Sequence, residues 1–208
     1  MVRALVAFAL AVAVFHHVPA VGGHAGDWID LATPFAVIGA AALVLLGLAA
    51  WGAGLGLAVA AGIAYVDGHG LHLAANSIRA EKPAGEVERV AYFWDEQFSH
   101  WEWHVGLVGL LVAFCLAEPW ARPPVRGSLA QRALVAALLG FTLFTSTVEG
   151  HTWWLLPPAA LVLAVWTLAR PRPVLGACAG ALVLACILLA GWAAWHRGVP
   201  EFSDLGWI

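Results

Sequence analysis

Charged side chains are scarce in this chain of 208 residues. Asp, Glu, Lys and Arg make up 11% of it and hydrophobic residues 62%, whereas a soluble domain carries about 25% and about 45–50%. Nucleic-acid-binding proteins, coiled coils and disordered chains all need charge that is missing here. The net charge of −3 gives no strong attraction for a charged partner. We therefore expect an integral membrane protein with no nucleic-acid partner.

Cysteine is also rare. Cys115, Cys178 and Cys186 all lie in apolar stretches, and none belongs to a CxxC pair. Such cysteines are typical of small apolar packing residues rather than of a disulfide framework.

Long charge-free runs are what the sequence has instead. The run from residue 31 to residue 66 would reach about 54 Å as one helix, far more than the about 20 residues that cross the hydrocarbon. The Trp51-Gly52-Ala53-Gly54 cluster provides a turn within it. We predict an all-α polytopic membrane helix bundle, a single transmembrane domain over 1–208, with about seven helices near 2–20, 33–50, 54–77, 89–117, 128–149, 154–169 and 174–196.

The first helix has an alternative interpretation as a cleavable signal peptide. Arg3 provides a short charged region, residues 4–15 an apolar segment, and Val18-Pro19-Ala20 a cleavage site. The mature chain would then have six helices with the same orientations.

The distribution of cations in the loops favours a cytoplasmic N-terminus in a bacterial-type plasma membrane. Arg79, Lys82, Arg89 and Arg197 then lie outside, and a larger set lies inside, in agreement with the positive-inside rule. That set is Arg3, Arg122, Arg126, Arg132, Arg170 and Arg172.

All nine histidines lie toward one membrane face in this topology, and that face is outside. The segregation depends only on the number of helices, so it survives reversal of the whole orientation. The nine are His16, His17, His24, His69, His72, His100, His104, His151 and His196.

Two of the predicted helices carry polar groups into the membrane. The apolar parts of helices 54–77 and 89–117 are only residues 55–66 and 105–117, too short to cross alone. The polar residues that complete them are costly in a bilayer unless they face the bundle interior and pair with something. A cation would satisfy several of them together.

The spacing of these groups predicts a metal site. Glu96, His100 and His104 form an i, i+4, i+8 row on one helix face, and a His pair at i, i+4 binds zinc in HExxH helices. His69 and His72 share a face of the preceding helix. Histidines with carboxylates suit zinc, or alternatively non-haem iron. We predict His69, His72, His100 and His104 as metal ligands, supported by Asn76, Asp95, Glu149 and His151.

A metal ion held there can lower the pKa of water to ~7. Glu96 is then the predicted general base, and the second predicted catalytic residue, Asp67, completes the ligand set or fixes a histidine tautomer. The expected partners are membrane lipid and a small lipid-like substrate that enters between helices. Arg79 and Lys82 are placed to hold an anionic head group, or are simply solvated loop residues.

The stretch from Ser99 to Gly109, with His100-Trp101-Glu102-Trp103-His104, resembles the HxxWH stretch and following glycine of alkaline ceramidases. These belong to a superfamily of seven-helix membrane hydrolases that includes adiponectin-receptor-like proteins. The superfamily binds zinc through three histidines, with an aspartate and a serine nearby, and cleaves lipid amides or related bonds. The resemblance implies that His100, His104 and one of the earlier pair bind zinc, with Asp67 as the family aspartate. The family pair lies on the last helix, whereas here it is on the fourth.

The sequence therefore predicts a metal-dependent membrane hydrolase that acts on a lipid amide or ester near the non-cytoplasmic face. One alternative is a di-iron hydroxylase or desaturase, although the chain has one HxxxH and no HxxHH motif. Another is a metal or proton transporter, which the apolar cytoplasmic halves of the helices disfavour. A third is a haem-binding subunit, since histidines on facing helices can ligate haem iron.

Overall fold

The computed structural model describes residues 2–18, 23–122 and 124–207, and for residues 23–25 and 27 only the backbone; the side chain of His24 is therefore outside the description. The described chain is helical and contains no strand. Its α-helices are α1 (Val2–His17), α2 (Gly23–Leu48), α3 (Ala53–Ala80), α4 (Glu86–Tyr92), α5 (His100–Ala117), α6 (Leu129–Glu149), α7 (Leu156–Ala169) and α8 (Pro173–His196). Shorter elements are the π-helix η2 (Phe93–Ser99) and the 3-10 turns η3 (Glu118–Trp120) and η4 (Trp153–Leu155).

The prediction of an all-helical protein with seven helices is confirmed, because α4, η2 and α5 follow one another without a break. The start of the second helix was predicted wrongly. It begins at Gly23 rather than at residue 33, since the acidic segment that we assigned to a loop is helical. The third helix also extends to Ala80 rather than ending at residue 77. Residues 19 and 20 of the first predicted helix lie outside the described residues.

Four segments of the described chain are long and apolar enough to cross a membrane: Trp28–Leu48, Glu86–Trp120, Leu129–Glu149 and Pro173–His196. Apolar side chains also cover much of the outer surface, where water would oppose them. Among the most exposed are Phe35, Leu46, Ile63, Leu161 and Leu168. These features identify a helical bundle of the membrane type.

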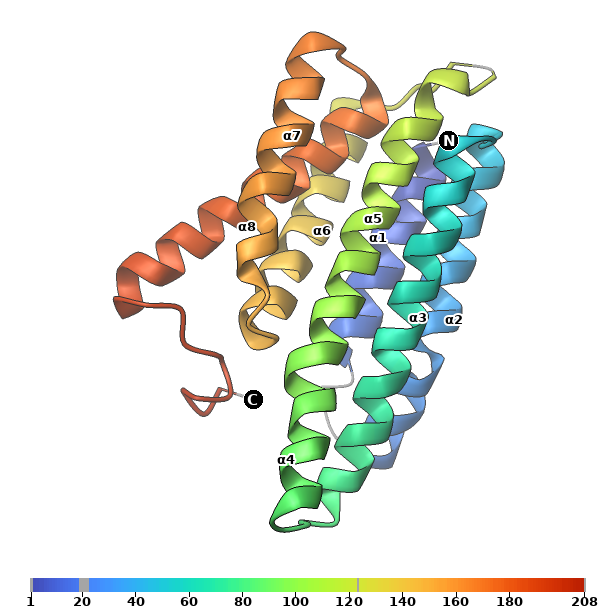
Figure 1. Cartoon of the computed structure of the whole chain (residues 1–208). Helices are drawn as coiled ribbons and strands as arrows, with labels where there is room; N and C mark the ends of the chain where they lie inside the picture. The colour runs from blue at the N-terminus through green and yellow to red at the C-terminus, as the bar shows by residue number, and fades with distance from the viewer. Residues whose placement is uncertain (1, 19–22, 123, 208) are drawn as a thin grey trace.

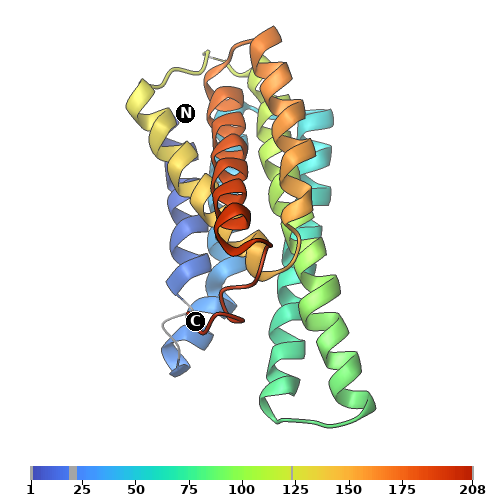
Figure 2. The ribbon, with the colours of Figure 1, turned by 90° about the vertical axis from the view of Figure 1, so that its left-hand side faces the viewer.

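The helices form two neighbouring groups (Figure 1). In one group α1, α2, α3 and α5 run side by side, and in the other α6, α7 and α8 pack together. Helix α1 packs on α6, and α5 packs on α8, so that the groups are joined along their length. The hairpin of α3 with α4, η2 and α5 extends beyond the other helices at its lower end (Figure 2).

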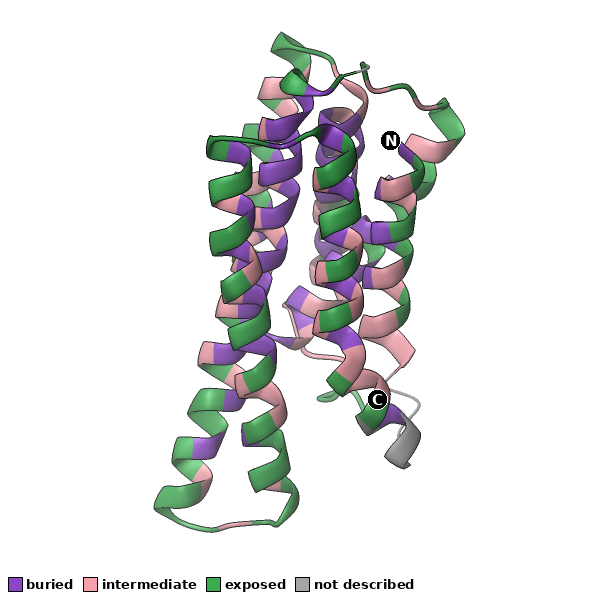
Figure 3. Ribbon diagram, turned by 90° about the vertical axis from the view of Figure 1, so that its right-hand side faces the viewer, coloured by how far each residue is buried: buried purple, intermediate pink, exposed green. Residues whose placement is uncertain are grey.

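The core lies between the helices, as the burial pattern in Figure 3 shows. Fully buried aromatic and aliphatic side chains of α1, α5, α6 and α8 fill it, among them Phe8, Phe114, Leu143 and Leu182.

Glycines bring α3 and α5 into direct backbone contact. A Cβ on Gly106 of α5 would lie 2.4 Å from the backbone nitrogen of Tyr65, and one on Gly68 of α3 would lie 2.5 Å from that of Trp103. Any side chain there would force the helices apart. This close contact brings the polar part of α3 against the histidine-bearing part of α5.

Candidate metal centre

The polar stretch that precedes α5 is a π-helix. Phe93–Ser99 continues from α4 and leads directly into His100 at the start of α5. Because π-helical hydrogen bonds run from i to i+5, residues five apart come into line. Asp95, five residues before His100, is accordingly only 1% exposed, whereas the side chain of Glu96 is 28% exposed. The single wide turn therefore brings Asp95, rather than Glu96, deepest into the bundle.

Asp95 connects α3 to the π-helix through both carboxylate oxygens. His72 Nδ1 lies 2.7 Å from Asp95 Oδ1, and Arg79 Nη1 donates to Asp95 Oδ2 at 2.8 Å. Arg79 also pairs with Glu96 and, at 3.6 Å, with Glu88. Its guanidinium lies 5.2 Å from the ring centroid of Tyr92. Arg79 is thus bound by carboxylates of its own chain rather than free to hold an anionic head group.

The two histidines of α5 are held in the same way as His72. His100 Nδ1 donates to the backbone oxygen of Glu96 at 3.2 Å. His104 Nδ1 lies 2.6 Å from Thr152 Oγ1, and the side chain is completely buried. The other nitrogen, Nε2 of His104, is buried with no hydrogen-bond partner among the described residues.

His72, His100 and His104 therefore share one arrangement, which we call the histidine trio. In each ring Nδ1 lies close to an oxygen atom, and Nε2 makes no hydrogen bond to the described residues, so its lone pair can bind a ligand. The ring centroids of His72 and His100 are 5.0 Å apart, and those of His100 and His104 are 6.0 Å apart. Imidazoles on one tetrahedral zinc, with Zn–N bonds of about 2.0–2.1 Å, have centroids about 5 Å apart. The separation of His72 and His100 fits two ligands of one ion, whereas that of His100 and His104 is about 1 Å longer.

The three histidine side chains do not form a closed metal site in this structure. Within the part of the chain that the structure describes, no three His, Cys, Asp or Glu side chains are gathered so that they could hold one ion.

The segment that follows α6 covers the trio. A Cβ on Gly150 would lie 2.9 Å from His100 Cγ and from His104 Cε1, so only glycine fits. His151 has a left-handed backbone with φ of 50°. Its Nδ1 lies 2.6 Å from Glu201 Oε1 in the C-terminal segment. Burial raises the pKa of Glu201 above its ordinary value, while the nearby His151 opposes that shift.

His69, predicted as a fourth ligand, lies outside the trio. Its Nε2 donates to the backbone oxygen of Asp30 at 2.9 Å and is 3.2 Å from Asp30 Oδ1. That carbonyl is free because Pro34, four residues later in α2, has no N–H to donate. The indole of Trp103 packs against His69 at 4.8 Å and against His72 at 5.8 Å between ring centroids. His69 thus has its own partner on α2.

Three other predicted site residues do not contact the trio. Asp67 and Asn76 are exposed on α3, and Asp67 lines a groove between α2 and α3. Glu149 Oε2 accepts the backbone N–H of Phe202 at 2.8 Å and of Ser203 at 3.3 Å. It holds the C-terminal segment rather than the histidines.

The sequence analysis missed two hydrogen-bond partners of the histidines, Thr152 for His104 and Asp30 for His69. Thr152 had no distinguishing signal, because its role depends on the turn that returns it to α5. Asp30 could have been found only by recognising that α2 begins early and that Pro34 frees a carbonyl.

The chain matches no family model, no curated protein and no solved structure.

Proposed function

We propose that this chain is a metal-dependent membrane hydrolase, with zinc bound by His72, His100 and His104, that cleaves an amide or ester bond of a lipid. The observation that carries the proposal is the shared arrangement of the histidine trio, in which each Nδ1 lies close to an oxygen and no Nε2 makes a hydrogen bond to the described residues.

A metal accounts for a polar group that packing leaves unsatisfied. A buried nitrogen with no partner costs about 1–3 kcal/mol, and His104 Nε2 is such an atom among the described residues. Oxygen acceptors next to Nδ1, here a carboxylate, a carbonyl and a hydroxyl, fix the tautomer of metal-binding histidines. Zinc in this place would supply Lewis acidity and an activated water at neutral pH.

The carboxylates take separate roles in this proposal. Asp95 is a positioning residue, since it orients His72 and is saturated by Arg79. Glu96 is the candidate general base, because it is partly exposed and its Oε2 lies 3.7 Å from His100 Nδ1. Arg79 bonds both groups and offsets their charge.

The same contacts favour one zinc over the alternatives. A di-iron centre needs carboxylates free to bridge two metals, whereas both oxygens of Asp95 lie close to His72 and Arg79. A transport path needs ionisable groups through the full depth. Glu118, the buried carboxylate at the opposite end of α5, instead accepts the backbone N–H groups of Val174 and Leu175 at the start of α8. It acts as a helix cap.

The proposed topology has seven crossings, with the N-terminus in the cytoplasm and the histidine-rich end outside. The trio then lies near the end of α6, beside Trp153 and Trp154, where indoles are typical of the membrane–water boundary. A lipid head group and water both reach that level, so the scissile bond is expected to belong to a lipid.

Metal content tests the site directly. We expect purified protein to contain about one zinc per chain, and the variants His72→Ala, His100→Ala and His104→Ala to lose it. His17→Ala is the matched control, because His17 is also partly buried but bonds Thr145 at 3.0 Å. Equal metal content in the trio variants and in the control would overturn the site.

Activity is tested separately, in liposomes that contain N-acyl and ester lipids. We expect release of fatty acid that stops on chelation, returns with zinc, and is lost in Glu96→Gln at unchanged zinc content. Zinc-loaded protein that releases no fatty acid from either lipid class would refute the hydrolase and leave a metal-binding membrane protein.

A further inference from the structure

We propose that the groove between α2 and α3 is a binding site for a membrane phospholipid whose head group ends in a primary ammonium. One acyl chain lies in the groove, and Asp67 and Glu102 bind the ammonium. This site goes beyond the proposed hydrolase activity and uses none of the histidine trio.

The groove is apolar along its length and acidic at one end. It has a volume of about 680 Å³, and Asp67 is the one ionisable residue among those that line it. The apolar lining comes from both helices and includes Ile38, Leu45, Val59, Ile63 and Val66. This is the surface that an acyl chain covers, and a free carboxylate beside it favours a cation.

The length of the groove matches one leaflet of a bilayer. On α3 the lining extends from Ala58 to Leu71, which is about 20 Å of helix. Half of the hydrocarbon core is about 15 Å. An acyl chain in the groove therefore places its head group near Asp67.

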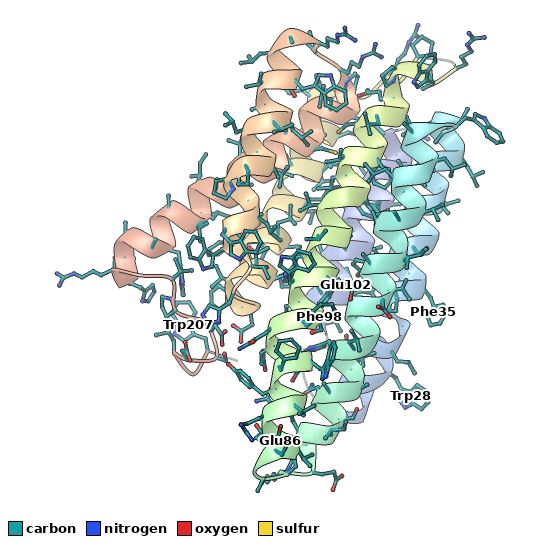
Figure 4. The ribbon with its side chains drawn as sticks, viewed as in Figure 1. Trp28, Phe35, Glu86, Phe98, Glu102 and Trp207 are labelled. Carbon is teal, nitrogen blue, oxygen red and sulfur yellow. The ribbon has the colours of Figure 1, made fainter. Side chains whose placement is uncertain are left out.

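A second carboxylate strengthens the negative end. Asp67 precedes Gly68 on α3 and Glu102 precedes Trp103 on α5, and these two following residues are in backbone contact. Glu102 lies where α5 borders α3 (Figure 4). Glu102 Oε2 is buried with no hydrogen-bond partner in the described chain. No Lys, Arg or His side chain of the described residues pairs with either carboxylate.

A primary ammonium fits this pair better than other lipid head groups. It has three N–H donors for two carboxylates. A quaternary ammonium has no N–H donor, and a glycerol head group brings no cation. Trp28, exposed on α2 toward the same end of the bundle (Figure 4), has the amphipathic side chain that is enriched at head-group level.

The test is retention of lipid after extraction from nanodiscs that contain phosphatidylethanolamine, phosphatidylcholine and phosphatidylglycerol in equal amounts, measured by native mass spectrometry. We expect the wild type to retain phosphatidylethanolamine in preference to both others. The double variant Asp67→Asn, Glu102→Gln should reduce that preference about tenfold, as for the loss of one charge-assisted hydrogen bond. Glu81→Gln, an exposed carboxylate at the end of α3, is the charge control.

A second variant blocks the groove without touching the carboxylates. A Cβ on Gly70 has no neighbour within 4 Å, so Gly70→Leu should fold and fill the groove. Gly56→Leu on the same helix is the control, because Gly56 is equally open and does not line the groove. We expect lipid retention to fall in Gly70→Leu only.

Two results would overturn the proposal. One is equal retention of the three lipids by the wild type. The other is a protein dimer that Gly70→Leu dissociates while lipid retention is unchanged, since a second copy would then occupy the groove. Zinc content is expected to be the same in all these variants, so the outcome is independent of the metal centre.

Discussion

At the scale of single residues, the site depends on which nitrogen of each imidazole is occupied. The sequence spacing placed His100 and His104 on one face of a helix, and the structure has both side chains there, buried. The spacing could not give the tautomers, because these depend on Asp95 across a π-turn and on Thr152 across a chain reversal. The prediction of four equivalent histidine ligands also could not separate His69, whose partner is a carbonyl freed by Pro34.

Thr152→Val tests the role of the hydroxyl group. The variant keeps the shape of the side chain but removes the acceptor for His104 Nδ1. Loss of a hydrogen bond to the outer nitrogen of a metal-binding histidine costs roughly 10–100-fold in metal affinity, so we expect zinc to dissociate at a correspondingly lower chelator concentration. Chelator competition measures it.

Thr142→Val is the matched control for that variant. Thr142 is fully buried on α6, and its hydroxyl bonds only the carbonyl of Leu138, at 2.9 Å. We expect its zinc affinity to equal that of the wild type. The same affinity in Thr152→Val and Thr142→Val would remove Thr152 from the site.

At the scale of helices, the sequence predicted elements well where hydrophobicity decides and poorly where polar contacts decide. Apolar runs predicted α6, α7 and α8 to within a few residues, because a lipid-facing helix must be apolar over its length. The predicted helix 89–117 corresponds to α4, η2 and α5 together. The beginning of α2 was missed because Asp27 and Asp30 have the composition of a loop. The π-helix was missed because a wide turn is stabilised by the tertiary contacts of Asp95, not by local propensity.

Gly106→Ala tests the backbone contact that holds α3 against α5. The added methyl group would meet the backbone of Tyr65 and Ala61 at 2.4–2.7 Å, and backbone cannot rotate away. Overpacking of this kind costs about 1–3 kcal/mol, so we expect a lower unfolding midpoint in detergent.

Gly56→Ala is the control on α3, where a Cβ meets nothing within 4 Å. Its higher helix propensity should leave the midpoint equal or slightly raised. If the two variants unfold at the same midpoint, the close contact of α3 and α5 does not stabilise the bundle.

At the scale of the whole molecule, the arrangement of chain ends decides the topology. Figure 1 places the N-terminus with the α5–α6 connection at one end of the bundle, and the C-terminus with the α3–α4 turn at the other. The two ends therefore face opposite sides of a membrane if all seven helices cross it. Among the described residues, four segments are long and apolar enough to cross by themselves, so seven crossings would require α1, α3 and α7 to be stabilised in the membrane by packing on these.

Cysteine labelling in intact cells tests this arrangement with single exposed substitutions. Cys115 and Cys178 are buried, and Cys186 lies within α8. A protein with the Cys186→Ala substitution should therefore not react with the maleimide at its remaining native cysteines. A membrane-impermeant maleimide should label Ala84→Cys in the α3–α4 turn and Leu205→Cys in the C-terminal segment. Arg122→Cys, in the α5–α6 connection, should react only after permeabilisation.

The reverse labelling pattern would keep seven crossings and invert the orientation. The positive-inside rule permits this, because the predicted cytoplasmic loops carry only six cationic side chains against four outside. Labelling of Ala84→Cys and Leu205→Cys from opposite sides would mean that one of the intervening helices does not cross, and the histidine trio would then lose its place at the outer boundary.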